Sequence, residues 1–420
     1  MKLKVSKKFD WKETRIDSIL QYIEPRIEIN DKTLYSLIKV KRNHGGLEVR
    51  EKLFGNQFKT KKQYRVILNS FIISRVQCWH KAFAFVNETS ENMIASTNYD
   101  QFKITSKTDK KFFWWLSHSP TFVKTIRDSA KGVDIEKMVF DRNKWLETKI
   151  LIPELSEQKK IVFRIEELFS KIDSTKQSLE HTKLQLEQYR HSLLKSAFEG
   201  KLTEKWREQN NIKQGYRSDV LGNLILFSKN GFTGKPNESK KGIPRLGIET
   251  ITQSDSIYVN ETMHKFIEIP TSKIDTYRAK EGDLFVCRQN GNQNYVGKCA
   301  IFKEIISPMI FSDSLIQFRV NMKLIFPAYL AFFINSHLGN NQLEKFRTTT
   351  AGNFSINGTN MKKIIIEHPS IEEQKQIVSQ IEQDFSLIEN TSQIVNSTLQ
   401  QLETMKISIL KQAFSGKLVS

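Results

Sequence analysis

The chain repeats its own sequence, and this repeat limits the fold more than any other feature. Residues 153–203 align without a gap to residues 369–419, an offset of 216 positions (153 to 369), and about half of the aligned residues are identical. Both copies begin with a proline followed by E-Q-K, and both end in A-F-x-G-K-L. Such a match indicates a duplication, so the chain should fold as two similar halves.

A fainter repeat precedes each of these segments. Residues 94–104 match residues 310–320 at the same offset, with identical serine, glutamine and phenylalanine positions. A slightly shifted register aligns Tyr64-Arg65 with Tyr277-Arg278, and Arg75 with Arg288. We therefore predict two domains of mixed α/β (α+β) type, 1–152 and 206–368, each followed by a conserved long helix, 153–205 and 369–420. The domains have diverged more than the helices, which suggests that the two domains have the same kind of function but act on different targets.

The repeated segments carry the heptad pattern of a coiled coil. No Pro or Gly occurs from residue 156 to 199, so about 44 residues can form one helix of roughly 66 Å. Gly200 and Gly416 stand where a glycine commonly ends a helix, and Ser370 with Glu373 forms a capping-box pattern. The positions predicted to pair the helices are Ile165, Ile172, Leu179, Leu186, Leu193, Ile381, Ile388, Val395, Leu402 and Ile409. An alternative is that both are amphipathic core helices of one large globule.

The net charge of +19 favours a polyanionic partner, and nucleic acid is the leading candidate. The basic residues are dispersed, and no apolar run approaches the roughly 20 residues that cross a bilayer, so we expect no membrane contact. The charged N-terminus lacks the apolar core of a secretory signal, which predicts a cytoplasmic protein. Cys78, Cys287 and Cys299 are widely spaced, and the histidines show no metal-binding spacing, so we expect neither disulfides nor a metal site.

Loops rich in Gly, Asn and Gln beside Lys and Arg suit close approach to double-stranded DNA. Backbone amides and cations can hold phosphates, while Arg, Asn and Gln can read guanine or adenine edges. In the first domain the candidate DNA contacts are Lys59, Lys61, Lys62, Arg75, Gln77, Lys107, Lys110 and Lys111. In the second domain they are Lys229, Lys235, Lys240, Lys241, Arg245, Arg288, Gln289, Asn290, Asn292, Gln293 and Arg347. Any one of them could instead be a solvated surface residue, but Arg75 and Arg288 end matching apolar strands and are the strongest candidates.

Motifs for catalysis are missing from the sequence. It contains no G-x-x-x-x-G-K-[ST] phosphate loop, and no Asp/Asn-Pro-Pro-Tyr/Phe motif of an adenine methyltransferase. Glu157-Gln-Lys159 and Glu373-Gln-Lys375 match half of a nuclease signature, whose carboxylates would hold Mg²⁺. Both stand in the first turn of a predicted helix, where glutamate also suits the positive end of the helix dipole. We therefore expect no catalytic residue, bound cofactor or metal in this chain.

These motifs together resemble the specificity subunits of Type I restriction-modification systems. The resemblance rests on the two E-Q-K/R-x-I-V and A-F-x-G-K-L segments and on Tyr277-Arg-Ala-Lys-Glu-Gly-Asp-Leu before a strand ending in Arg288. It is weaker in the first domain, where Asn69-Ser70 replaces Gly282-Asp283. It implies two target-recognition domains, each reading half of an asymmetric bipartite site, and antiparallel helices that set the unread spacer in a pseudo-twofold molecule.

The resemblance also implies partners for the long helices. Two modification subunits would bring S-adenosylmethionine and an adenine-N6 methyltransferase site, and two restriction subunits would use ATP and Mg²⁺ to move along and cut DNA. One fused restriction and methylation polypeptide could replace these separate subunits. Two further interpretations stay open: a nuclease or methyltransferase in its own right, and a coiled-coil scaffold whose charge only keeps it soluble.

Overall fold

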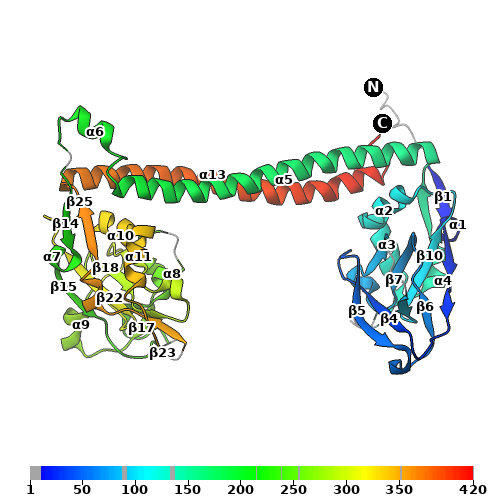
Figure 1. Ribbon diagram of the computed structural model, residues 1–420, viewed down its shortest axis with the longest axis horizontal. Coiled ribbons are helices and arrows are strands. Elements are labelled where there is room, and N and C mark those ends of the chain that lie inside the picture. Colours follow the sequence, from blue (N-terminus) through cyan, green and yellow to red (C-terminus); the bar gives the residue numbers. More distant parts are fainter. Residues whose placement is uncertain are drawn as a thin grey trace. The chain divides into compact units, whose positions relative to one another are not determined.

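The computed structural model describes residues 11–87, 92–132, 138–213, 215–237, 239–253, 256–350 and 352–419. These residues form two compact units. Unit 1 comprises the first domain with the ends of the long helices nearest to it, up to residue 179 and from residue 396 onward; unit 2 comprises residues 180–395. Figure 1 shows the strands and most of the short helices of each unit lying under a pair of long helices. The division into two units rules out the single large globule.

Unit 1 contains two main sheets and several short helices. Its strands are β1 (Lys12–Arg15), β2 (Leu20–Ile23), β3 (Arg26–Ile27), β4 (Leu34–Val40), β5 (Leu47–Phe54), β6 (Gln63–Arg65), β7 (Ser70–Ser74), β8 (Phe83–Phe85), β9 (Met93–Ser96), β10 (Tyr99–Ile104), β11 (Ala130–Lys131), β12 (Val139–Phe140) and β13 (Lys149–Ile152). Its short helices are α1 (Ile16–Ile19), α2 (Lys110–His118), α3 (Pro120–Asp128) and α4 (Arg142–Leu146). The sheets have the strand orders β2-β10-β7-β8 and β3-β6-β9-β4-β5.

Unit 2 repeats the four-stranded sheet, but its other two main sheets have three strands each. Its strands are β14 (Arg217–Val220), β15 (Ile225–Asn230), β16 (Ile243–Leu246), β17 (Lys265–Ile267), β18 (Leu284–Cys287), β19 (Gln289–Asn290), β20 (Cys299–Ile301), β21 (Ile310–Phe311), β22 (Leu315–Val320), β23 (Thr348–Thr350), β24 (Asn353–Ser355) and β25 (Ile365–His368). Its short helices are α6 (Glu204–Gln209), α7 (Leu221–Leu224), α8 (Glu249–Thr252), α9 (Thr271–Tyr277), α10 (Pro327–Asn335), α11 (His337–Glu344) and α12 (Gly358–Met361). Here β15-β22-β18-β20 corresponds to β2-β10-β7-β8.

The sheet registers confirm the shifted alignment of the two domains. Arg65 pairs with Ile94 in unit 1, and Arg278 pairs with Ile310 in unit 2. Likewise, the amide of Arg75 donates to Asn98, and the amide of Arg288 donates to Ser314. The duplication therefore extends through both domains, although their side chains differ.

The departure from the family pattern at Asn69 has a backbone explanation. Asn69 has φ = 59°, and Gly282 at the equivalent position has φ = 80°. Both lie in the left-handed region, which glycine enters freely and asparagine tolerates better than most residues. The amides of the two residues donate to equivalent carbonyls, those of Val86 and Phe302. The substitution keeps the same turn, so the first domain has the same register as the second.

The long helices are α5 (Leu155–Phe198) and α13 (Ile371–Ala413). In unit 1 the start of α5 packs against the end of α13, and Ile165, Ile172, Leu402 and Ile409 join the core of the domain. In unit 2 the end of α5 packs with the start of α13 around Phe198 and Ile381. The predicted pairing positions are buried except Leu179 and Leu186, which are half-buried. The predicted fold class, two mixed domains with antiparallel coiled-coil helices, is confirmed.

The predicted glycine caps are also present. Gly200 and Gly416 have φ of 76° and 73° two and three residues after the ends of the two helices, the conformation of a C-terminal glycine cap. The amide of Glu373 donates to Ser370 Oγ at 3.3 Å, which is one half of the predicted capping box. The carboxylate of Glu373 instead contacts Thr203 and Arg207.

Candidate nucleic-acid interface

A buried glutamine joins each domain to its long helix. Gln158 Oε1 accepts from the amide of Asp109 at 2.8 Å, and its Nε2 donates to the carbonyls of Lys107 and Pro153. Gln374 makes the equivalent set with Phe326, Leu324 and Pro369. Both side chains are fully buried, so each amide is committed to fixing one end of a domain against the helix. The sequence repeat identified these glutamines but not their role.

A second joint repeats in the same way. Phe169 of α5 lies edge-on to Trp115 of α2, with the Lys406 ammonium 5.4 Å from its ring centroid. In unit 2, Phe385 of α13 lies edge-on to Phe332 of α10, with the Arg190 guanidinium 4.3 Å away. Each domain therefore rests on the helix pair through an aromatic contact and a cation–π contact from the opposite helix. Both domains are held by the same set of contacts.

The two glutamates of the E-x-K segments bond to protein groups. Glu157 accepts from Trp11 Nε1 at 2.8 Å. Glu373 accepts from Thr203 at 2.7 Å and forms a buried ion pair with Arg207, which follows the end of α5. Arg207 also donates to the carbonyl of Gly200. These contacts give both carboxylates a structural role. Among the described residues, no group of three or more His, Cys, Asp or Glu could hold a metal ion.

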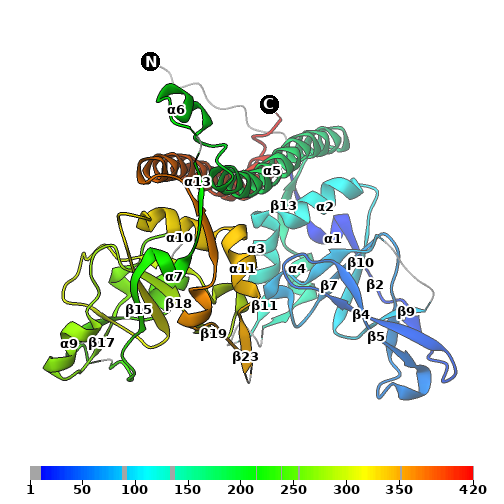
Figure 2. The same ribbon diagram turned by 60° about the vertical axis from the view of Figure 1, so that its left-hand side comes forward.

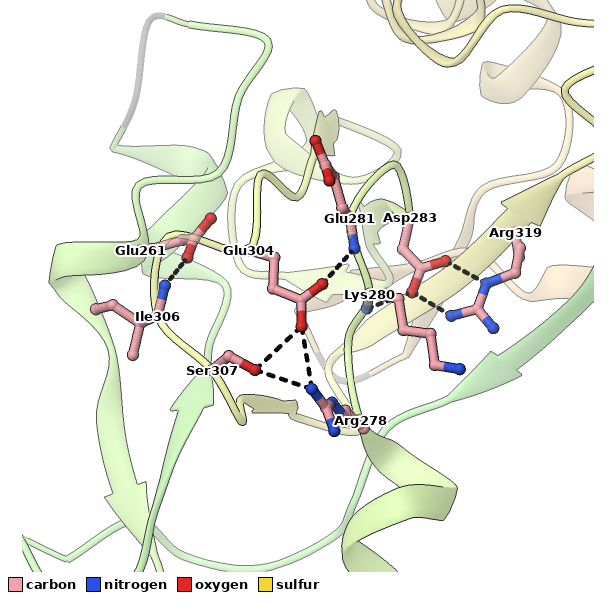
Figure 3. A network of polar contacts seen from close by, with 9 residues as sticks. All are labelled: Glu261, Arg278, Lys280, Glu281, Asp283, Glu304, Ile306, Ser307 and Arg319. Carbon is pink, nitrogen blue, oxygen red and sulfur yellow. Dashed lines mark hydrogen bonds and ion pairs between the residues drawn. The ribbon is translucent and has the colours of Figure 1, made fainter.

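Asp283 organises the loop before Arg288 in the second domain. Figure 3 shows its carboxylate held by the Arg319 guanidinium, with two contacts of 2.7 Å, and by the amide of Lys280. Nearby, Glu304 accepts from Arg278 and from the amide of Glu281. Asp283 is fully buried, so these bonds fix the Tyr277–Leu284 stretch.

Arg75 and Arg288 lie at equivalent strand ends, as the sequence predicts, and both already contact protein groups. Arg288 Nη1 donates to the carbonyl of Asp313 at 3.1 Å. The Arg75 guanidinium is exposed and lies 3.9 Å from the nearly buried Asp100. Both arginines line the starts of the loops that follow β7 and β18.

The other candidates in the second domain fall into two groups. Lys235, Lys240 and Lys241 are exposed on the loop between β15 and β16. Gln289, Asn290, Asn292 and Gln293 form β19 and the turn after it, with Asn290 and Asn292 capping that turn through their side chains. Lys229, Arg245 and Arg347 instead bond to carbonyl groups of their own domain, those of Thr276, Gly234 and Val296.

Arg245 suits a DNA contact least among these residues. It stands on β16, the central strand between β17 and β21, and its side chain is buried. Burial lowers the pKa of Arg245, with Asp313 3.9 Å away partly opposing this effect. The other second-domain residues remain predictions as DNA contacts.

The first-domain candidates occupy separate places. Lys59, Lys61 and Lys62 lie on the exposed loop before β6, where Lys61 pairs with Asp31. Gln77 accepts from Arg42 at 2.8 Å, close in sequence to Arg75. Lys107, Lys110 and Lys111 lie beside the start of α5, and Lys111 pairs with Glu166 of that helix at 2.9 Å. The structure thus divides these residues between the domain loops and the helix joint.

Several large apolar side chains are exposed along the long helices. They are Phe163, Leu184, Leu387, Ile394, Met405 and Ile407, each more than half exposed. In the described part of the chain, no helix is both apolar enough and long enough to cross a membrane. A contiguous patch of such side chains would mark a site for protein contact.

The family model and the curated relatives that match this chain all describe Type I restriction specificity proteins. Residues 221–404 match the Type I restriction modification DNA specificity domain. The chain is 31% identical over 272 residues to the EcoKI specificity subunit of Escherichia coli K12, and 30% identical over 271 residues to the StySPI specificity subunit of Salmonella potsdam. Each match covers 64% of this chain and 58% of the relative, so the chain spans less than two thirds of either relative's length.

Solved structures share the fold over almost the whole chain. The HsdS subunit from Thermoanaerobacter tengcongensis aligns over 98% of both chains with a TM-score of 0.64 and 17% identity. A chain from a structure of complex assembly and conformational transition in a type I R-M system aligns with a TM-score of 0.70 and 17% identity, over 98% of this chain and 99% of that one. Residues 221–404 thus match a Type I restriction modification DNA specificity domain, the chain is similar to Type I restriction enzyme specificity subunits over 64% of its length, and it shares the fold of HsdS subunits.

Proposed function

We propose that the chain reads an asymmetric, bipartite double-stranded DNA site, one half with each domain. One observation supports this proposal: the two domains join the long helices in the same way, but their loops differ. Gln158 and Gln374 attach the two domains to the long helices through the same bonds, whereas the loops after Arg75 and Arg288 share no side-chain pattern. Two similarly mounted domains with different loops suit two different DNA sequences.

The long helices supply the spacer and the docking surface in this proposal. Their exposed apolar residues would receive two modification and two restriction subunits, or one fused polypeptide of the same activities. Those partners would supply S-adenosylmethionine, ATP and Mg²⁺. The two glutamates of this chain that match half of a nuclease signature, Glu157 and Glu373, are engaged in structural bonds. The chain itself would act in the cytoplasm as the non-catalytic specificity subunit of an adenine-N6 methyltransferase and ATP-dependent endonuclease.

A DNA selection experiment tests this proposal. The chain would be tagged and purified with its partners from the source cell, then used to select duplexes from a random library. We expect two short sequences at a fixed separation, unrelated to one another. A single continuous sequence, or no enrichment at moderate salt, would contradict bipartite reading.

Charge removal on the loop between β15 and β16 should weaken binding to all sequences equally. Lys235, Lys240 and Lys241 are exposed there, and lysine contacts to phosphate release counterions without reading bases. The variant K235A/K240A/K241A should reduce the slope of log K against log salt by roughly 2 to 3 and leave the selected sequence unchanged. Binding titrations from 50 to 200 mM salt measure the slope, and a changed consensus would show that these lysines read bases.

A further inference from the structure

A short three-stranded ribbon at the end of unit 2 has the chemistry of a base-reading surface. It consists of β19, β24 and β23, in that order, and β23 with β24 forms a hairpin. In both views of the molecule this hairpin lies at the end of unit 2 away from α13 (Figures 1 and 2). The sequence singled out β19 but not the hairpin beside it.

One face of the ribbon carries polar side chains only. Gln289 is opposite Ser355, and Ser355 is opposite Thr348, while Thr350 is opposite Asn353. Because directly opposed residues in a sheet place their side chains on the same face, these five side chains share one surface. All five are amides or hydroxyls, and no carboxylate lies on the ribbon.

The other face of the ribbon attaches it to the domain. Phe354, which is opposite Thr349 and Asn290, packs against the unit 2 core and is half-buried. The amide of Ile356 donates to the carbonyl of Arg288 at 2.9 Å, which fixes the ribbon beside the predicted Arg288 loop. Thr348, Thr350 and Asn353 are exposed on the polar face, and Thr349 is also exposed on the face that carries Phe354. The contact of Phe354 with the core holds the ribbon in a fixed position, and the polar face is left open to solvent.

We infer that this polar face enters the major groove and determines base preference in the half-site of the second domain. The inference deepens the proposed function and rests on it. The major groove admits a two-stranded β-ribbon, and its base edges carry both donors and acceptors. Amide side chains can bond adenine through two atoms, and Thr or Ser hydroxyls can bond either donors or acceptors. The absence of acidic side chains on the ribbon removes repulsion from phosphates.

The first domain has an equivalent hairpin with different chemistry. The amide of Phe140 on β12 donates to the carbonyl of Arg75 at 2.8 Å, as Ile356 does to Arg288. There Lys131 is opposite Val139, so an ammonium and an exposed aliphatic group replace the Thr348 and Ser355 hydroxyls. Residues 133–137 of that hairpin lie outside the described residues. The same backbone position therefore presents different groups in the two domains, as two different half-sites require.

The test uses adjacent threonines on opposite faces. Thr350→Val with Asn353→Ala removes groups from the polar face, whereas Thr349→Val changes the same strand on the face that carries Phe354. Valine keeps the shape and strand preference of threonine but has no hydroxyl. Full-length variants, purified with their partners, would select duplexes from the random library, and thermal melting would confirm that each variant is folded.

We expect T350V/N353A to lose roughly tenfold discrimination at one or two adjacent positions of a single half-site. The other half-site should stay unchanged and serves as an internal control, and T349V should select the wild-type sequence. Unchanged selection by folded T350V/N353A would overturn the inference while leaving the proposed function intact, as would equal loss in both half-sites. If the wild-type complex selects no bipartite sequence, the proposed function fails and the inference fails with it.

Discussion

Replacing Glu373 by alanine is expected to lower the free energy of unfolding by about 3 to 5 kcal/mol, because it leaves the Arg207 guanidinium buried without its partner. The two side chains are 2% and 7% exposed, so water cannot replace the lost carboxylate. Arg207 also bonds Thr203 and the carbonyl of Gly200, and its displacement should loosen the end of α5. Urea denaturation measures the total effect, and hydrogen exchange of residues 200–210 and 371–378 locates it.

The duplication offers a matched control for this substitution. Glu157 is the equivalent residue in the first copy, but it is half-buried and accepts one indole N–H bond from Trp11. Glu157→Ala should therefore cost only about 1 to 2 kcal/mol. Equal losses of unfolding free energy for the two variants would mean that the ion pair with Arg207 does not contribute to stability. If either glutamate held Mg²⁺ for catalysis, substitution would instead abolish DNA cleavage by the chain alone.

Inserting one heptad in each long helix should reduce affinity for the native site by roughly 10² to 10⁴-fold, because only one half-site can then be bound at a time. Seven residues add about 10.5 Å, or roughly three base pairs, and keep the apolar seam in phase. Insertions after residues 184 and 393 would place the added turns on both helices. The ion pairs of Lys176 with Glu403 and of Lys406 with Asp173 indicate the antiparallel register used to match them.

The insertion variant can be checked by selection from the random library. We expect the same two half-sites at a changed separation, because the recognition domains themselves are unchanged. A control that replaces exposed residues in the same heptads without changing their number should retain the native separation. Wild-type affinity for the native spacing would show that the helices do not set the distance between half-sites.

Those parts of the molecule that depend on local sequence could be predicted. The heptad positions are visible because apolar residues must recur along one helix face, and Gly200 and Gly416 mark its ends because few residues adopt a left-handed cap. The register linking Arg75 with Arg288 could also be predicted, since both residues end an apolar strand. These features repeat, so each copy supports the interpretation of the other.

Features that depend on long-range packing could not be predicted in the same way. Arg245 looks like a surface cation in sequence, but its side chain is buried and bonds the carbonyl of Gly234. Arg207 lies just beyond the conserved repeat, so nothing in its surroundings indicated a bond with Glu373. The polar face of β23 and β24 depends on strand pairing, because the run of three threonines shows no alternation that separates Thr349 from its neighbours.

Domain exchange tests the bipartite reading most directly. Residues 1–152 would be replaced by the corresponding domain of another specificity subunit, and methylated bases would be mapped across the genome of the source cell. The account predicts that one half of the methylated motif changes while the other half and the length of the unread spacer are retained. A change in both halves, or a motif that is unaffected by the exchange, would contradict independent reading by two domains.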